Sequence, residues 1–356
     1  MASTINTDPA RLERLRSRYP GKFFLTSDLP TVAAYLTAQK WLAPHETLQQ
    51  VVPAGTGNMN CVLRVVTSLR SFILKQSRPW VEKYPDIPAP WDRALIEAKF
   101  YRATARSPQL QGHLPHLIAV DSEERLLMLE DLDKAQDFTS LYSGVGSRLT
   151  EPESNQLIDF LIALHTSIRA PGLRNTFSNE AMRALNHEHI FEVPLRRRNG
   201  LNLDAITPGL SGLAQDLQND GWYCREVAAL GARYLDRSSG ECLIHGDYFP
   251  GSWLSAREQV FIIDPEFCFF GLPEWDLAVM AAHLSLTGHS PAEIDNGVRR
   301  YTAFRAVDHR LVNQFAGIEI MRRLIGVAQL PVLFPLERKA ELLSLSRALV
   351  LEGRTA

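Results

Sequence analysis

Hydrophobic and polar residues follow one pattern in the first third of the chain and another in the rest. Short runs rich in Val, Leu and Ile at residues 48–55, 61–68 and 71–77 are typical of strands, and the Gly-containing connection between the first two is typical of a turn. Helical spacing of apolar residues covers 92–106, and Ser27 or Asp28 can cap a helix that runs to about Leu42.

Residues 78–91 contain four prolines, which limit both helix and sheet, so we expect an ordered loop there. Another strand pair is predicted within 116–132, with a polar turn at Asp121–Glu124. After Asp133 helical patterns dominate, and a short strand pair at 241–248 and 259–266 interrupts them.

Strands first and helices later predict an α+β protein of two lobes. We place the N-terminal lobe, rich in strands and with one main helix, at residues 1–132, and the larger, mostly helical C-terminal lobe at 133–356.

The composition excludes several classes of protein. The chain has 356 residues, of which 45% are hydrophobic and 22% charged, so it can bury large cores. A net charge of −2 gives no general attraction for nucleic acid or an anionic membrane. The four cysteines lie far apart, and the N-terminus lacks the apolar stretch of a signal peptide. We therefore expect a cytoplasmic protein with free thiols and no membrane or nucleic-acid partner.

Two aspartates carry the strongest signal of chemistry. Asp247, in Ile-His-Gly-Asp, and Asp264, in Ile-Asp-Pro-Glu, each follow a short apolar run, so each lies where a strand gives way to a loop. Phosphoryl transfer needs one carboxylate that orients the attacking hydroxyl and accepts its proton, and another that holds the metal on the nucleotide phosphates. Either aspartate alone is as well explained as an ordinary turn residue.

Lys75 ends the apolar run Phe-Ile-Leu-Lys, which suggests a buried cation with a partner. Glu97, on the predicted helix at 92–106, can supply the carboxylate. A strand Lys paired with a helix Glu positions the nucleotide phosphates in kinase-like folds. An ordinary surface Lys and a Glu on a helix face are the simpler alternative.

Two further stretches suit a nucleotide. Gly55, Gly57, Asn58 and Asn60 lie in a turn between two strands, where glycines let a backbone close over phosphates. The apolar strand at 126–132 enters a polar linker, where backbone groups at Glu130 and Leu132 could hydrogen-bond an adenine. Each stretch alone is weak evidence.

The four features occur in kinase order, and the chain resembles the aminoglycoside phosphotransferase/choline kinase superfamily over residues 30–350. Within it the likeness is greatest to the 5-methylthioribose kinases. The stretches that carry this likeness are Phe-Ile-Leu-Lys-Gln with Pro-Trp-Val at 72–81, His-Gly-Asp with Gly-Ser at 245–252, Asp-Pro-Glu-Phe at 264–267 with Phe-Phe-Gly at 269–271, and Met-Arg-Arg-Leu-Ile-Gly at 321–326.

The resemblance implies a protein-kinase-like fold, ATP and Mg²⁺ as cofactors, and a small-molecule hydroxyl as acceptor. It also suggests a homodimer. By this resemblance, Asp247 would be the catalytic base or orient the attacking hydroxyl, and Asp264 and Glu266 would bind Mg²⁺. Lys75 would contact the phosphates, and Trp80 would belong to a loop near the active site. Arg322 and Arg323 would contact the substrate or the phosphoryl group, and Asp276 would brace the catalytic loop.

Ser252 departs from the usual kinase pattern, which has Asn five residues after the catalytic Asp as a metal ligand. A neutral hydroxyl is a poorer Mg²⁺ ligand, and Glu266 offers the missing carboxylate. Adjacent arginines on a helix point about 100° apart, so we expect Arg322 and Arg323 not to fill one pocket equally, and one of them to pair with Glu319. A solvated basic face is the alternative.

The leading interpretation is an ATP-dependent kinase of a small sugar, most closely 5-methylthioribose or a related pentose. The alternatives are an aminoglycoside- or choline-type phosphotransferase and, because of Ser252, a nucleotide-binding pseudokinase. Basic residues outnumber acidic ones from Leu277 to the end, which argues mildly against a polycationic acceptor.

Overall fold

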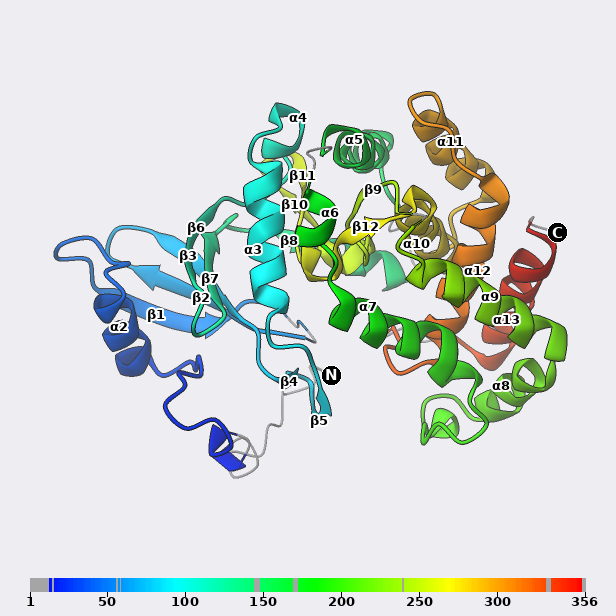
Figure 1. The fold of residues 1–356 in the computed structure, drawn as a ribbon, viewed down its shortest axis with the longest axis horizontal. Coiled ribbons are helices and arrows are strands. Elements are labelled where there is room, and N and C mark those ends of the chain that lie inside the picture. Colours follow the sequence, from blue (N-terminus) through cyan, green and yellow to red (C-terminus); the bar gives the residue numbers. More distant parts are fainter. Residues whose placement is uncertain are drawn as a thin grey trace. The chain divides into compact units, whose positions relative to one another are not determined.

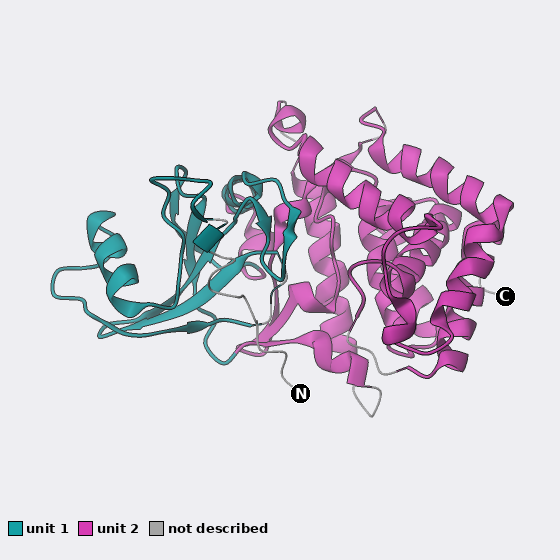
Figure 2. Cartoon of the chain, turned by 90° about the horizontal axis from the view of Figure 1, so that it is seen from below, with its two compact units in different colours: residues 1–103, 114–134 teal, residues 104–113, 135–356 magenta. Residues whose placement is uncertain are grey.

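The computed structural model describes the chain apart from residues 1–12, 15, 56, 58, 144–147, 169–171, 239, 331–333 and 354–356. The chain divides into two compact units, one of residues 1–103 with 114–134 and the other of residues 104–113 with 135–356 (Figure 2). The division therefore does not fall at a single point of the sequence.

The first unit is built on a five-stranded antiparallel sheet in the order β1-β2-β3-β7-β6 (Figure 1). Its strands are β1 (Leu48–Pro53), β2 (Cys61–Thr67), β3 (Ser71–Gln76), β6 (Leu117–Asp121) and β7 (Leu126–Glu130). In the central strand Lys75 lies opposite Val62 and Leu127. One face of the sheet packs on helix α2 (Leu29–Ala38) through a core that includes Leu36, Phe72 and Leu74.

The two predicted helices of this unit are present. Asp28 caps α2 by accepting from the backbone N–H of Thr31 at 3.0 Å. The helix ends earlier than expected, because Lys40 adopts a left-handed backbone with φ of 57°. The second helix is α3 (Arg93–Thr104).

The predicted loop at 78–91 is wrong in part, since it contains a small hairpin of β4 (Trp80–Val81) and β5 (Tyr84–Pro88). Each strand of a two-stranded hairpin leaves one edge without a partner strand, so a proline that lacks an N–H is tolerated there. The prolines therefore restrict this segment without excluding strands.

The second unit is mostly helical (Figure 1). Its α-helices are α4 (Pro108–Gln111), α5 (Glu151–Ser167), α6 (Leu173–Thr176), α7 (Glu180–His187), α8 (Leu210–Asn219), α9 (Gly221–Leu235), α10 (Pro273–Leu286), α11 (Pro291–Thr302), α12 (His309–Ile325) and α13 (Leu336–Glu352). No helix in the described ranges is long and apolar enough to cross a membrane.

Five short strands lie between these helices. They are β8 (Gln136–Asp137), β9 (Cys242–Ile244), β10 (Trp253–Ala256), β11 (Gln259–Ile262) and β12 (Phe269–Gly271). The two runs predicted as one strand pair do not pair with each other: β9 pairs with β12, and β11 pairs with β10. The actual partner strands, β12 and β10, are only three and four residues long. Strands of this length are too short to give a clear hydrophobic pattern in the sequence.

From Gln314 to its end, helix α12 is buried on all sides, against α10 and α13 among others. Asp308 caps it by accepting from the N–H of Leu311 at 3.2 Å. A helix surrounded by protein must satisfy its charged side chains internally. Three such residues, Glu319, Arg322 and Arg323, lie in its last two turns.

Candidate active site

Asp247 lies on the loop that follows β9, and its side chain is 20% exposed. The preceding Gly246 has a φ of 88°, and a Cβ there would lie 2.3 Å from the carbonyl oxygen of Phe267. Only glycine accepts both the backbone conformation and the close approach. The Asp247 loop therefore packs directly against the backbone of the segment that follows Asp264.

Asp276, in the first turn of α10, braces this loop. Its carboxylate accepts from the backbone N–H of His245 at 2.6 Å and from that of Gly246 at 2.9 Å. His165 lies 3.1 Å from the same carboxylate through Nε2, and its Nδ1 lies 2.8 Å from the hydroxyl of Tyr301. The predicted bracing contact of Asp276 is thus present in the structure.

His245 ties the two aspartate loops together. Its Nε2 lies 3.0 Å from the carbonyl oxygen of Ile263, the residue before Asp264. Burial lowers the pKa of His245, so the imidazole is neutral near pH 7 and Nε2–H donates to that oxygen. The two sequence signals at Asp247 and Asp264 therefore belong to one site.

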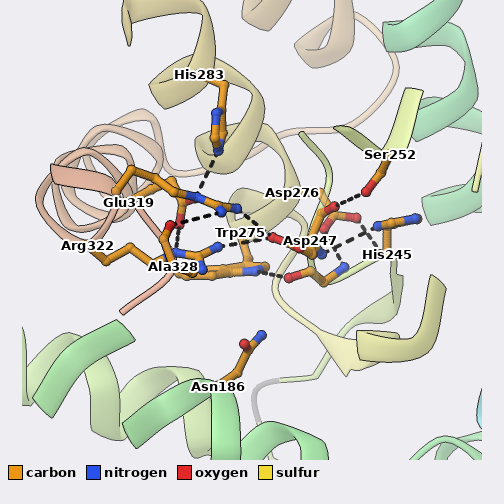
Figure 3. A network of polar contacts seen from close by, with 12 residues as sticks. Asn186, His245, Asp247, Ser252, Trp275, Asp276, His283, Glu319, Arg322 and Ala328 are labelled. Atoms are coloured by element: carbon orange, nitrogen blue, oxygen red, sulfur yellow. Dashed lines mark hydrogen bonds and ion pairs between the residues drawn. The ribbon is translucent and has the colours of Figure 1, made fainter. Parts of the chain in front are cut away.

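Arg322, labelled in Figure 3, reaches Asp247, and so does its neighbour Arg323. Their terminal nitrogens lie 3.0 and 3.1 Å from the same oxygen, Oδ1. The expectation that the two arginines would not fill one pocket equally is wrong, since both contact Asp247 and both, not one, pair with Glu319. The alternative of a solvated basic face is also wrong, because both side chains are buried. The Cβ atoms of the two arginines point in different directions from the helix, but each side chain is long enough to bend toward Asp247. Among the described residues, none bonds to Oδ2 of Asp247.

Glu319 holds both arginines from the other side. Its oxygens accept from Nε of Arg322 at 2.5 Å and from Nε of Arg323 at 2.7 Å. Burial alone would raise the pKa of Glu319, but Arg322 and Arg323, with a hydrogen bond from His283, hold it well below its ordinary value. Glu319 is therefore a carboxylate at neutral pH.

Ser252, a predicted metal ligand, closes the loop that begins at Asp247. Its hydroxyl donates to the Asp247 carbonyl oxygen at 3.1 Å, and its backbone N–H donates to Phe249 at 2.7 Å. The proton of the hydroxyl is thus used within the loop, while lone pairs of Oγ remain for another contact.

Asp264 and Glu266 follow β11, as predicted. Asp264 adopts a left-handed backbone with φ of 62°, and Glu266 is buried in the short 3₁₀ turn Pro265–Phe267. Asn179 donates to the backbone oxygens of Glu266 and Cys268 at 2.9 and 3.0 Å, which anchors this turn. No group of three or more metal-binding side chains occurs in the described part of the chain. A pair of carboxylates nevertheless suits Mg²⁺, which takes one or two of them together with phosphate oxygens.

The first unit contains the predicted ion pair. Nζ of Lys75 on β3 lies 2.6 Å from a carboxylate oxygen of Glu97 on α3, and both side chains are buried. Of the turn residues, Gly55 has a left-handed φ of 79° and Asn60 accepts from Arg93 Nε at 2.9 Å. Asn58 lies outside the described residues.

The remaining predicted residues of this unit are less telling. Glu130 ends β7, and its side chain accepts from the N–H of His116 at 3.1 Å. Leu132 is buried. Trp80 lies in β4, 2% exposed, with its ring 5.4 Å from that of Phe24. Their roles toward a ligand stay predictions.

The structure adds residues that the sequence did not single out. His283, on α10, lies 3.0 Å from Glu319 through Nε2 and 2.5 Å from the Tyr142 hydroxyl through Nδ1. His165 and Tyr301 support Asp276 in the same way. The sequence could have pointed to His283 as a polar residue within an apolar helix. It could not have identified the partner Tyr142, which is 141 positions away in the chain.

Comparison with known proteins defines the class. Residues 50–311, well over half of the chain, match the phosphotransferase enzyme family. The chain therefore belongs to this family, and it is a small-molecule kinase that transfers a phosphoryl group to an alcohol.

The curated relatives include methylthioribose kinases. That of Exiguobacterium sibiricum is 26% identical over 346 residues, covering 83% of this chain and 86% of the relative. That of Geobacillus sp. (strain WCH70) is 27% identical over 367 residues, covering 91% of this chain and 89% of the relative. The resemblance expected from the sequence is thus confirmed.

Solved structures confirm the kinase-like α+β fold. LicA in complex with AMP superposes with a TM-score of 0.55 at 14% identity, covering 93% of this chain and 100% of LicA. A spectinomycin phosphotransferase in complex with ADP and spectinomycin gives a TM-score of 0.52 at 12% identity, covering 91% of this chain and 98% of the other.

Proposed function

We propose that this protein uses Mg²⁺ and ATP to phosphorylate a hydroxyl of a small uncharged sugar, 5-methylthioribose or a related pentose. The observation that carries the proposal is the pair of buried arginines on Asp247. The similarity to methylthioribose kinases over most of both chains supports the same substrate class.

Asp247 is proposed to orient the acceptor. Both arginines hold Oδ1, so Oδ2 is the oxygen available to accept a hydrogen bond from the attacking hydroxyl and then its proton. The guanidinium groups beside it also stabilise negative charge that develops on the transferred phosphoryl group.

The nucleotide end uses other carboxylates. Asp264 and Glu266 would hold Mg²⁺, which neutralises charge on the phosphates when it is bound. Lys75, oriented by Glu97, would contact the phosphates. Ser252 is proposed to contribute at most its Oγ lone pairs, since its hydroxyl proton is donated to the backbone carbonyl oxygen of Asp247.

The arginine pair also argues against the aminoglycoside- and choline-type alternative. A cationic acceptor beside Asp247 would lie next to two guanidinium groups. Their two positive charges are already matched by the negative charges of Glu319 and Asp247. Since these four charges cancel, they leave no excess negative charge to attract a cation, and placing one beside the guanidinium groups has an electrostatic cost. A neutral acceptor avoids this cost.

The test is ADP release coupled to an indicator reaction, with Mg-ATP and a panel of 5-methylthioribose, 5-deoxyribose, ribose, choline, homoserine and aminoglycosides. Asp247→Asn is the blank. We expect turnover that depends on 5-methylthioribose or another uncharged pentose and is absent from the blank. Turnover on choline or an aminoglycoside in preference to every sugar would refute the proposed substrate class.

A further inference from the structure

The two arginines at Asp247 are held by a buried cluster that does not itself touch Asp247. We name Tyr142, His283 and Glu319 the arginine-holding triad. Figure 3 shows His283 directed at Glu319, which lies beside Arg322. Glu319 and His283 are fully buried, and Tyr142 nearly so.

Glu319 takes three hydrogen bonds and divides them between its oxygens. Oε2 accepts from Nε of Arg322, while Oε1 accepts from Nε of Arg323 at 2.7 Å and faces His283 Nε2 at 3.0 Å. Because a guanidinium group is planar and rigid, a hydrogen bond that holds Nε also fixes the direction of the outer nitrogens, which are the atoms that meet Asp247.

The protonation state of His283 follows from its neighbours. Burial raises the pKa of Tyr142 well above its ordinary value, so its hydroxyl keeps its proton and donates to His283 Nδ1. The proton of the neutral imidazole is then on Nε2, which donates to Glu319. Burial, with Arg323 nearby, lowers the pKa of His283 to about 4, so it stays neutral near pH 7.

Charge explains why a neutral donor is needed. Arg322 and Arg323 carry two positive charges, and Glu319 and Asp247 carry two negative ones, so the set is balanced. A cation at position 283 would leave one positive charge in excess in a buried site. A neutral Nε2–H instead satisfies a second lone pair of Glu319 Oε1 without disturbing the balance.

We infer that Tyr142, His283 and Glu319 are positioning residues for phosphoryl transfer, which direct both guanidinium groups at Asp247 and so leave Oδ2 for the acceptor hydroxyl. The inference rests on the proposed role of Asp247. None of the three touches the reacting atoms, so their effect must pass through the arginines. The phenyl ring of Phe249, under Arg323 at 4.6 Å, completes the support.

The experiment compares two substitutions of His283. His283→Gln places an amide N–H where Nε2–H was and keeps the donor to Glu319. His283→Leu removes it. We expect the Gln variant to keep kcat within about threefold and the Leu variant to lose at least about tenfold in kcat, with KM for ATP unchanged in both.

His289→Leu is the matched control, because His289 is also buried with a lowered pKa but contacts Thr287 and Leu149 outside the triad. It should lower the melting temperature without lowering kcat. Equal kcat for His283→Leu and the wild type, or equal losses in the Gln and Leu variants, would overturn the inference.

A second readout does not depend on turnover. Nitrogen-15 NMR of the imidazoles should show His283 as the neutral Nε2–H tautomer between about pH 5.5 and 8. Finding the Nδ1–H tautomer, or a titration near pH 6.5, would overturn the triad. If instead the tautomer is as expected but no acceptor supports turnover, the proposed function fails while the geometry of the triad stands.

Discussion

The loop that carries Asp247 is supported by two hydrogen-bonded sets of tyrosine, histidine and carboxylate. One is the arginine-holding triad. The other, which we name the backbone-holding triad, consists of Tyr301, His165 and Asp276. In both, the histidine faces a tyrosine hydroxyl through Nδ1 and a buried carboxylate through Nε2.

The triads differ in what their carboxylates hold. Asp276 accepts from the N–H groups of His245 and Gly246, so it holds the backbone that precedes Asp247. Glu319 holds two side chains, Arg322 and Arg323, that hold the Asp247 carboxylate. The same arrangement of tyrosine, histidine and carboxylate therefore holds the loop backbone in the backbone-holding triad and orients the Asp247 carboxylate in the arginine-holding triad.

The largest effect is expected at the residue where both triads converge. Asp247→Asn replaces the proton acceptor Oδ2 by an amide NH2 and removes the negative charge that faces both arginines, while it keeps the shape of the side chain. We expect turnover to fall at least ~1000-fold, roughly 4 kcal/mol of barrier, with ATP binding retained. Steady-state kinetics and ATP titration measure it. A rate within about tenfold of the wild type would contradict the assignment of Asp247.

The next largest effect is on folding. Asp276→Ala leaves two buried N–H groups and His165 without their acceptor, which we expect to lower the free energy of unfolding by about 3 kcal/mol or more. Urea unfolding measures the change. If the enzyme unfolds at the wild-type midpoint, the backbone-holding triad does not support the loop.

The arginine-holding triad should make stability depend on pH. The pKa of His283 is about 4 in the folded protein and near 6.5 in the unfolded chain, so the unfolded state binds more protons between these values. The free energy of unfolding should therefore be greatest above about pH 6.5 and fall as the pH drops toward 4, by roughly 2 to 3 kcal/mol from this group.

His283→Gln tests this dependence, since it cannot take up the proton. Unfolding midpoints measured at several pH values should show a flatter acid limb in the variant than in the wild type. An identical acid limb in the two proteins would assign the dependence to other groups.

The smallest effect is expected at the metal ligands. Glu266→Ala should raise the Mg²⁺ concentration needed for half-maximal activity by about tenfold, roughly 1.4 kcal/mol, because it removes a carboxylate. Ser252→Ala should raise it less, since the Ser252 hydroxyl already donates its proton to the Asp247 carbonyl. Equal shifts in Mg²⁺ titrations of the two variants would undo this ranking.

Local patterns predicted much of this molecule. Runs rich in Val, Leu and Ile, with turn residues between them, located the strands of the five-stranded sheet. An isolated charge at the end of an apolar strand located Lys75, which is paired with Glu97 in the structure. The ends of apolar runs likewise located Asp247 and Asp264.

What local patterns missed depends on contacts between distant residues. Tyr142 and His283 are 141 positions apart, and His165 and Tyr301 are 136 apart, so nothing in either neighbourhood reveals the pairing. The convergence of Arg322 and Arg323 was also missed, because helical geometry places Cβ atoms and not the ends of long side chains.

The most direct test of the account uses two acceptors that differ in charge. 5-Methylthioribose is neutral, and the sulfonium obtained by methylating its sulfur is one methyl group larger and singly positive. With Mg-ATP, the arginine pair at Asp247 predicts a kcat/KM at least about 100-fold higher for the neutral acceptor, roughly 2.7 kcal/mol. Equal or better turnover of the sulfonium would contradict the proposal that this site receives an uncharged sugar.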